Sequence, residues 1–244
     1  MSIQESFISH GSHPWFVEFV GPGCSGKTTL LKCLKSRYGD EFSYIGAPEL
    51  TRFSRAMTRL REVLCNRRVF NGYHLDASSR GRLIKGFSTV TGGLDWYARC
   101  RGGIFVVDEG PFRVLMDYAV QGEIPYQLWR NFCIKALEEL ARYRILLIVV
   151  QADPAVRVER GKKRREASGK AATEGYPGAG ADGASSPPRR FFREEAISLI
   201  ETGKYKNFHI VTLLNDNEAG EVALRARHLI HDRTACTKGL KPVN

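Results

Sequence analysis

The chain contains no long apolar run and no apolar stretch of the kind that forms a signal peptide. Its longest continuous apolar run is residues 145–150 (ILLIVV), whereas a helix needs about 20 apolar residues to span a bilayer. The first residues include Glu5 and lack the apolar centre of a secretory signal. Both absences predict a cytoplasmic protein with no transmembrane segment.

The cysteines lack the spacings that indicate a metal site or a disulfide framework. Six are present, and no two of them form a C-x-x-C pair. Several fall in segments with helical periodicity, which is typical of reduced thiols in a cytosolic protein.

Acidic residues are the minority among the charged ones. The 37 basic residues outnumber the 26 acidic residues and give a net charge of +11, which favours polyanionic partners such as nucleotides, nucleic acid or an anionic membrane. The basic segment 155–170 contains no aromatic residue, and this disfavours nucleic acid, whose bases stack on interleaved aromatic side chains.

Residues 21–28 (GPGCSGKT) match the phosphate-binding pattern G-x-x-x-x-G-K-[ST] at every fixed position. The motif, called the P-loop below, follows a predicted strand (15–20) and precedes a predicted helix. Glycines allow successive N–H groups to face phosphate oxygens, and the helix N-terminus adds partial positive charge. Lys27 is expected to reach the outer phosphates and Thr28 to hold Mg²⁺. The predicted ATP-binding residues here are Gly21, Pro22, Gly23, Cys24, Ser25, Gly26, Lys27, Thr28 and Thr29.

Predicted strands and helices alternate along the rest of the chain, which indicates a parallel sheet with right-handed crossovers. Further strands are predicted at 42–45, 104–107, 145–150 and 208–214. Helices are predicted at 50–63, at 74–101 with a break near Gly92-Gly93, at 126–142, from 153 onward and at 218–230.

Residues 167–188 interrupt this alternation, because they consist mainly of Gly, Ala, Ser and Pro. Such a segment cannot bury enough apolar surface to offset its ordering entropy, so a mobile lid insertion is predicted. Residues 15–232 are expected to form one domain around it, with tails at 1–14 and 233–244.

Two acidic residues follow the predicted strand 104–107. The carboxyl ends of parallel strands gather ligands, so Asp108 is predicted to face Mg²⁺ together with Thr28 and to take part in catalysis. Glu109 is a second catalytic candidate, with a helix cap for the segment after Pro111 as the alternative.

The basic helix after Pro154 carries Arg157, Arg160 and Arg164 on one face, at spacings of three and four residues. Such a face could clamp the transferring phosphoryl group, or it could be a solvated surface beside the insertion. The functional interpretation makes Arg160 and Arg164 catalytic and Arg157 a nucleotide ligand.

Taken in order, these features resemble the small P-loop kinases, particularly the thymidylate kinase-like and nucleoside monophosphate kinase-like group. The resemblance rests on residues 21–31, on VVDEGP at 106–111, on Asp153-Pro154 with its arginines, and on the last strand with Asn215-Asp216 and Glu221-Val222. It implies a three-layer α/β P-loop nucleoside triphosphate hydrolase fold, with a five-stranded parallel sheet in the order 2-3-1-4-5 and a basic lid. The segment with Asn215-Asp216 is similar to that family's purine-contacting loop.

The chain departs from that family in three ways. Thymidylate kinases carry an Asp-Arg-Tyr/His-type motif after the third strand, where this chain has Asp108-Glu109-Gly110. The insertion at 167–188 is longer than a lid needs, and residues 47–100 show no clear thymidine-pocket signature. The acceptor therefore stays undetermined.

The predicted function is an ATP- and Mg²⁺-dependent kinase that moves the γ-phosphoryl group to a small acceptor, with nucleosides and nucleotides among the candidates. The alternative is a P-loop ATPase acting as a regulatory, transport-coupled or nucleic-acid-linked switch. Transporter ATPases need an LSGGQ signature, for which TGGL at 91–94 is a poor substitute. A homodimer is one of the oligomeric states that the sequence allows.

Overall fold

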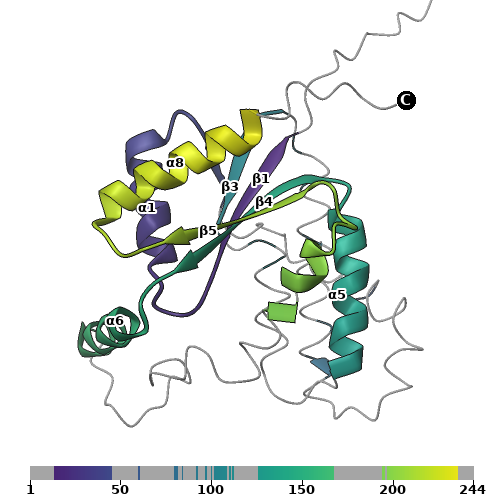
Figure 1. Ribbon diagram of the computed structural model, residues 1–244, viewed down its shortest axis with the longest axis horizontal. Helices are drawn as coiled ribbons and strands as arrows, with labels where there is room; N and C mark the ends of the chain where they lie inside the picture. The colour runs from purple at the N-terminus through teal and green to yellow at the C-terminus, as the bar shows by residue number, and fades with distance from the viewer. Residues whose placement is uncertain are drawn as a thin grey trace, which may run out of the picture.

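The computed structural model places the P-loop directly after the central strand of a parallel sheet, at the carboxyl ends of the strands (Figure 1). It describes residues 14–45, 60, 80–81, 84, 92, 97, 100, 102–108, 110, 112, 126–167, 194–195 and 197–235.

Five parallel strands form the sheet, in the order β2-β3-β1-β4-β5. This confirms the predicted fold class and strand order. All six residues of the central strand are buried, as expected for a parallel strand covered on both faces. The strands are β1 (Trp15–Val20), β2 (Ser43–Ile45), β3 (Ile104–Val107), β4 (Arg144–Gln151) and β5 (Phe208–Leu214).

Helices cover both faces of the sheet, which makes three layers (Figure 1). Helices α1 (Lys27–Tyr38) and α8 (Ala219–Ala235) lie together on one face, and α5 (Tyr126–Leu140) lies on the other. Helix α6 (Pro154–Ala167) follows β4 and projects beyond the carboxyl ends of the strands. It is the element predicted as the basic lid helix.

Side chains of β1 alternate between two apolar clusters, one under each helical layer. Phe16 and Val20 belong to the cluster that contains Leu137 and Leu140 of α5. Val17 and Phe19 belong to the cluster with residues of α1 and α8, among them Leu30, Leu34, Val222 and Ile230. The buried positions of α8 recur every three or four residues, so one face of this helix meets the sheet.

Several predictions fall largely outside the described residues. The insertion at 167–188 does so except for Ala167, which ends α6. The predicted helices at 50–63 and 74–101 are described only at single positions, where Leu60, Arg80 and Tyr97 are helical. Within the described part of the chain, no helix has the length and apolarity needed to cross a membrane.

Candidate nucleotide-binding site

The P-loop curls between β1 and α1 at points where a larger residue would not fit. Gly26 has φ 89°, and a Cβ there would overlap Nδ2 of Asn215. At Gly21 a Cβ would overlap the carbonyl oxygen of Val150 in β4. The glycines therefore let the loop approach both β4 and the segment after β5.

The start of α1 leaves its first amide groups without a side-chain cap. Gly26 occupies the N-cap position, no side chain there accepts a hydrogen bond, and the first turn contains no acidic residue. The first N–H groups of a helix have no partner within the helix, and together with the helix dipole they favour an anion. A bound phosphate group would accept hydrogen bonds from these amide groups and supply the negative charge that no side chain provides here.

Lys27 places its ammonium inside the curve of the loop. Its Nζ donates to the carbonyl oxygens of Gly21 at 2.8 Å and Pro22 at 2.9 Å, and lies 3.4 Å from Oγ of Ser25. These contacts hold the positive charge beside the helix N-terminus, where the sequence motif predicts the outer phosphates of ATP.

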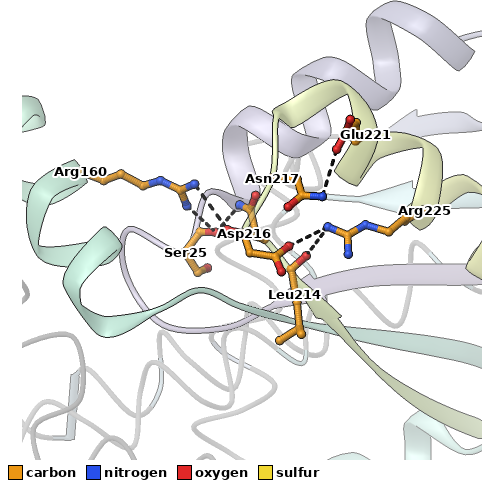
Figure 2. Close-up of polar contacts among 8 residues, drawn as sticks. Ser25, Arg160, Leu214, Asp216, Asn217, Glu221 and Arg225 are labelled. Atoms are coloured by element: carbon orange, nitrogen blue, oxygen red, sulfur yellow. Dashed lines mark hydrogen bonds and ion pairs between the residues drawn. The ribbon is translucent and has the colours of Figure 1, made fainter.

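Two other elements meet the P-loop at the carbonyl oxygen of Ser25. The buried Asn215, directly after β5, donates from Nδ2 to this oxygen at 2.6 Å. Arg160 reaches it from α6, with Nη1 at 3.4 Å, and its Nη2 lies 3.5 Å from the carbonyl oxygen of Asn215 (Figure 2). The loop is thus joined to α6 and to the segment between β5 and α8.

The segment that carries Asn215 is held by its own polar contacts (Figure 2). Arg225 of α8 donates to Oδ1 of Asp216 at 2.8 Å and to the carbonyl oxygen of Leu214 at 3.0 Å. The Arg225 hydrogen bond holds the pKa of Asp216 below its ordinary value. Asn217 donates to Glu221 at 3.0 Å. These contacts fix the chain on both sides of Asn215.

The arginines of α6 are not equivalent in the structure. Arg160 contacts the P-loop, Arg157 is half-buried, and Arg164 is exposed. The helix begins as predicted, because Oδ1 of Asp153 accepts the N–H of Ala155 at 2.7 Å ahead of the first turn. Of the three predicted arginines, only Arg160 has a hydrogen bond to the P-loop among the described contacts.

Asp108 directly follows β3, which pairs with β1, the strand that leads into the P-loop. The register pairs Val107, the residue before it, with Glu18 of β1. Asp108 is half-buried, and Thr28, its predicted partner for Mg²⁺, is exposed in the first turn of α1. Glu109, the other acidic candidate, lies outside the described residues.

No profile of a known protein family matches the chain, and no curated protein is similar to it in sequence. Among solved structures, it is similar to a deoxyadenosine kinase from M. mycoides with bound dATP, with a TM-score of 0.47 and 11% identity, over 88% of this chain and 99% of that chain. The strand order and the P-loop geometry carry the fold assignment by themselves.

The predicted oxygen donors Asp108 and Thr28 are of the kind that Mg²⁺ prefers. Magnesium prefers oxygen ligands and is usually held by one or two protein groups together with substrate phosphates. Asp108 and Thr28 offer one carboxylate and one hydroxyl. The described residues contain no group of three His, Cys, Asp or Glu side chains placed to hold a metal. Asp108 and Thr28 are the candidates that the sequence motifs predict.

Two residues of this region were not predicted as site residues. Glu18 stands out in the strand WFVEFV as the one charge in an apolar run, and it is 1% exposed. Asn215 was named only within the resemblance to a purine-contacting loop. The position of Asn215 directly after the last strand could have indicated a site residue, since ligands bind at the carboxyl ends of the strands in a parallel sheet.

Proposed function

We propose that this protein is a P-loop kinase that transfers the γ-phosphoryl group of ATP to a small acceptor. The observation that carries the proposal is the meeting of two cations at one loop. Lys27 lies inside the P-loop, and Arg160 reaches the same loop from α6. Cations that surround a transferring phosphoryl group from separate elements stabilise the charge that develops in its transition state.

Each site residue has a role under this proposal. The P-loop amides and Lys27 bind the phosphates, while Thr28 and Asp108 hold Mg²⁺, which neutralises phosphate charge when bound. Arg160 contacts the phosphoryl group after moving from the carbonyl oxygens of Ser25 and Asn215. Glu109, Arg157 and Arg164 remain proposed site residues, with Arg157 as a nucleotide ligand.

A small hydroxyl-bearing acceptor, such as a nucleoside or nucleotide, is proposed for the same site. The most specific form of this proposal is a thymidylate kinase-like acceptor specificity, which rests on the sequence resemblance. Residues 15–232 are proposed to fold as one domain. A cytoplasmic location agrees with the free thiols of Cys24, Cys33 and Cys133.

The test is ADP release from Mg²⁺ and ATP in the presence of separate panels of nucleosides, nucleotides, sugars and aminoglycosides. We expect release to rise many-fold with one acceptor class and the phosphorylated acceptor to appear in equal amount. Hydrolysis that is independent of every acceptor would instead favour the regulatory or transport-coupled ATPase.

A further inference from the structure

Glu18 is the one charged residue of the buried central strand. It lies between Val17 and Phe19 and is 1% exposed. The alternation of side chains along β1 places it on the same face as Phe16 and Val20. Taking a carboxylate out of water costs free energy unless hydrogen bonds replace its hydration, so its local contacts are informative.

Two residues of the segment that follows β3 meet this carboxylate. The amide N–H of the buried Phe112 donates to Oε2 of Glu18 at 3.1 Å. Gly110 lies so close that a Cβ there would stand 2.9 Å from Oε1 and closer still to Oε2 and Cδ. The hydrogen bond and the close approach at Gly110 are separate observations, and they join Glu18 to Phe112 and Gly110.

We propose that Glu18 is a positioning residue that anchors the backbone at Gly110 and Phe112 and thereby holds Asp108 in place for Mg²⁺. The inference rests on the proposed function, which gives Asp108 its role. Glu18 is too buried to touch substrate, so it acts through this backbone. The register supports the link, because Glu18 pairs with Val107, the residue before Asp108.

A purely structural role would not need a carboxylate here. Every other residue of β1 is apolar, and an apolar side chain would fill the same face without the cost of burying a charge. A carboxylate forms stronger hydrogen bonds to N–H groups than a neutral acceptor does. The charge of Glu18 also affects Tyr97. Burial is the main cause that raises the pKa of Tyr97 well above its ordinary value, and the negative charge of Glu18 is the next.

The first experiment compares the wild type with Glu18→Ala and Glu18→Gln. Hydrogen exchange of the peptide that covers 108–112 is measured without ligand, and binding of a fluorescent ATP analogue is titrated with Mg²⁺. We expect faster exchange in Glu18→Ala and an increase of about 10- to 100-fold in the Mg²⁺ concentration for half-saturation. Glu18→Gln keeps an acceptor oxygen but loses the charge, so its shift should be smaller.

A control variant separates positioning from stability. Ile230 is fully buried in the cluster on the opposite face of the sheet. Ile230→Ala should lower the melting temperature and leave the Mg²⁺ half-saturation within about twofold of the wild type. If Ile230→Ala shifted it as far as Glu18→Ala at equal stability, the effect of Glu18 would be structural.

A double-mutant cycle with Gly110→Ala tests the contact itself. The added Cβ must displace the segment from Glu18, so we expect Gly110→Ala alone to raise the Mg²⁺ half-saturation about as much as Glu18→Ala does. The double variant should show little further loss, because both changes break the same contact. Losses that multiply would show that the two residues act independently and would contradict the proposal.

Failure of this inference differs from failure of the proposed function. A wild type that binds the analogue with Mg²⁺ but phosphorylates no acceptor would remove the kinase assignment, while the exchange and Mg²⁺ comparisons still decide the role of Glu18. Conversely, unchanged exchange in Glu18→Ala, or faster exchange with an unchanged Mg²⁺ half-saturation, overturns the inference even where phosphotransfer is intact.

Discussion

Gly26 and Asn215 show how single residues shape the site. The φ of 89° at Gly26 belongs to the left-handed region, and a side chain there would overlap Nδ2 of Asn215. The space that glycine leaves is used by the amide that donates to Ser25 at 2.6 Å. A glycine of the motif thus serves two needs, the turn of the loop and the approach of a residue from the far end of the chain.

Replacing Asn215 by Ala should loosen the P-loop. The variant leaves the carbonyl oxygen of Ser25 without its amide donor, and losing a buried hydrogen bond costs about 1–3 kcal/mol. We expect a lower free energy of unfolding in urea and weaker binding of ATP. Asn217→Ala is the matched control, because it removes an exposed amide from the same segment and should change stability by less than about 0.5 kcal/mol.

Lys27→Ala should lower activity strongly and leave the fold intact. Removing a preorganised donor from a developing charge costs about 3–4 kcal/mol, or roughly 10²–10³-fold in kcat. The side chain is half-buried, so the melting temperature should change little. Lys32→Ala, an exposed change on α1, controls for loss of positive charge. Full phosphotransfer by folded Lys27→Ala would contradict the proposed role.

At the scale of elements, α6 is more than a charged surface. Its residue Arg160 joins the P-loop, whereas Lys163 forms an exposed pair with Glu159 at 2.7 Å, four residues away on the same helix. The spacing of arginines placed three of them on one face, yet the contacts distinguish them. The difference arises from the path of α6 past the P-loop, and helical periodicity does not encode that path.

We expect Arg160→Ala to lower kcat more than it weakens ATP binding, by about 10²-fold, since under the proposed function its contact with the phosphoryl group would form mainly in the transition state. Lys163→Ala, the exposed control, should leave both unchanged. Arg164→Ala should have a smaller effect than Arg160→Ala, because Arg164 is exposed. Steady-state kinetics, together with direct measurement of the ATP dissociation constant, ranks the effects of the three variants. Equal effects of Arg160→Ala and Lys163→Ala would show that the arginines of α6 are solvated surface charges.

At the scale of the whole molecule, contacts join elements that are distant in the sequence. Glu41, between α1 and β2, accepts hydrogen bonds from Arg227 at 2.7 Å and lies 2.7 Å from Nε2 of His231, both on α8. The hydrogen bonds of Arg227 and His231 hold the pKa of Glu41 below its ordinary value of 4.5. This cluster lies on the helical layer formed by α1 and α8.

The Glu41 cluster predicts a pH dependence of stability. A carboxyl group whose pKa is lowered by folding stabilises the fold above its unfolded pKa, and this contribution is lost as the pH falls through the folded value. Glu41→Gln should therefore reduce stability at pH 7 by about 0.5 kcal/mol, a small amount because the pair is solvated. The difference from wild type should vanish well below pH 4.5, the ordinary value, in urea denaturation. A difference that persists at lower pH would contradict this account.

The fold was largely predictable because its signals are local. The alternation of apolar strands with amphipathic helices gave the parallel sheet, and the spacing of glycines, lysine and threonine gave the P-loop. Asp153 and Pro154 marked the start of α6 by the chemistry of helix capping alone. The strand order came from the family resemblance to small P-loop kinases, and the structure confirms it.

The amino-acid sequence by itself determined where the P-loop lies and which elements flank it, because the loop and its neighbouring strand and helix depend on residues that are close in the sequence. Only the tertiary structure decided that Glu18 meets Phe112, 94 residues away, and that Asn215 meets Ser25, 190 residues away. Such contacts depend on strand register, in which a shift of one residue turns every side chain to the other face. No spacing within a single segment carries that information.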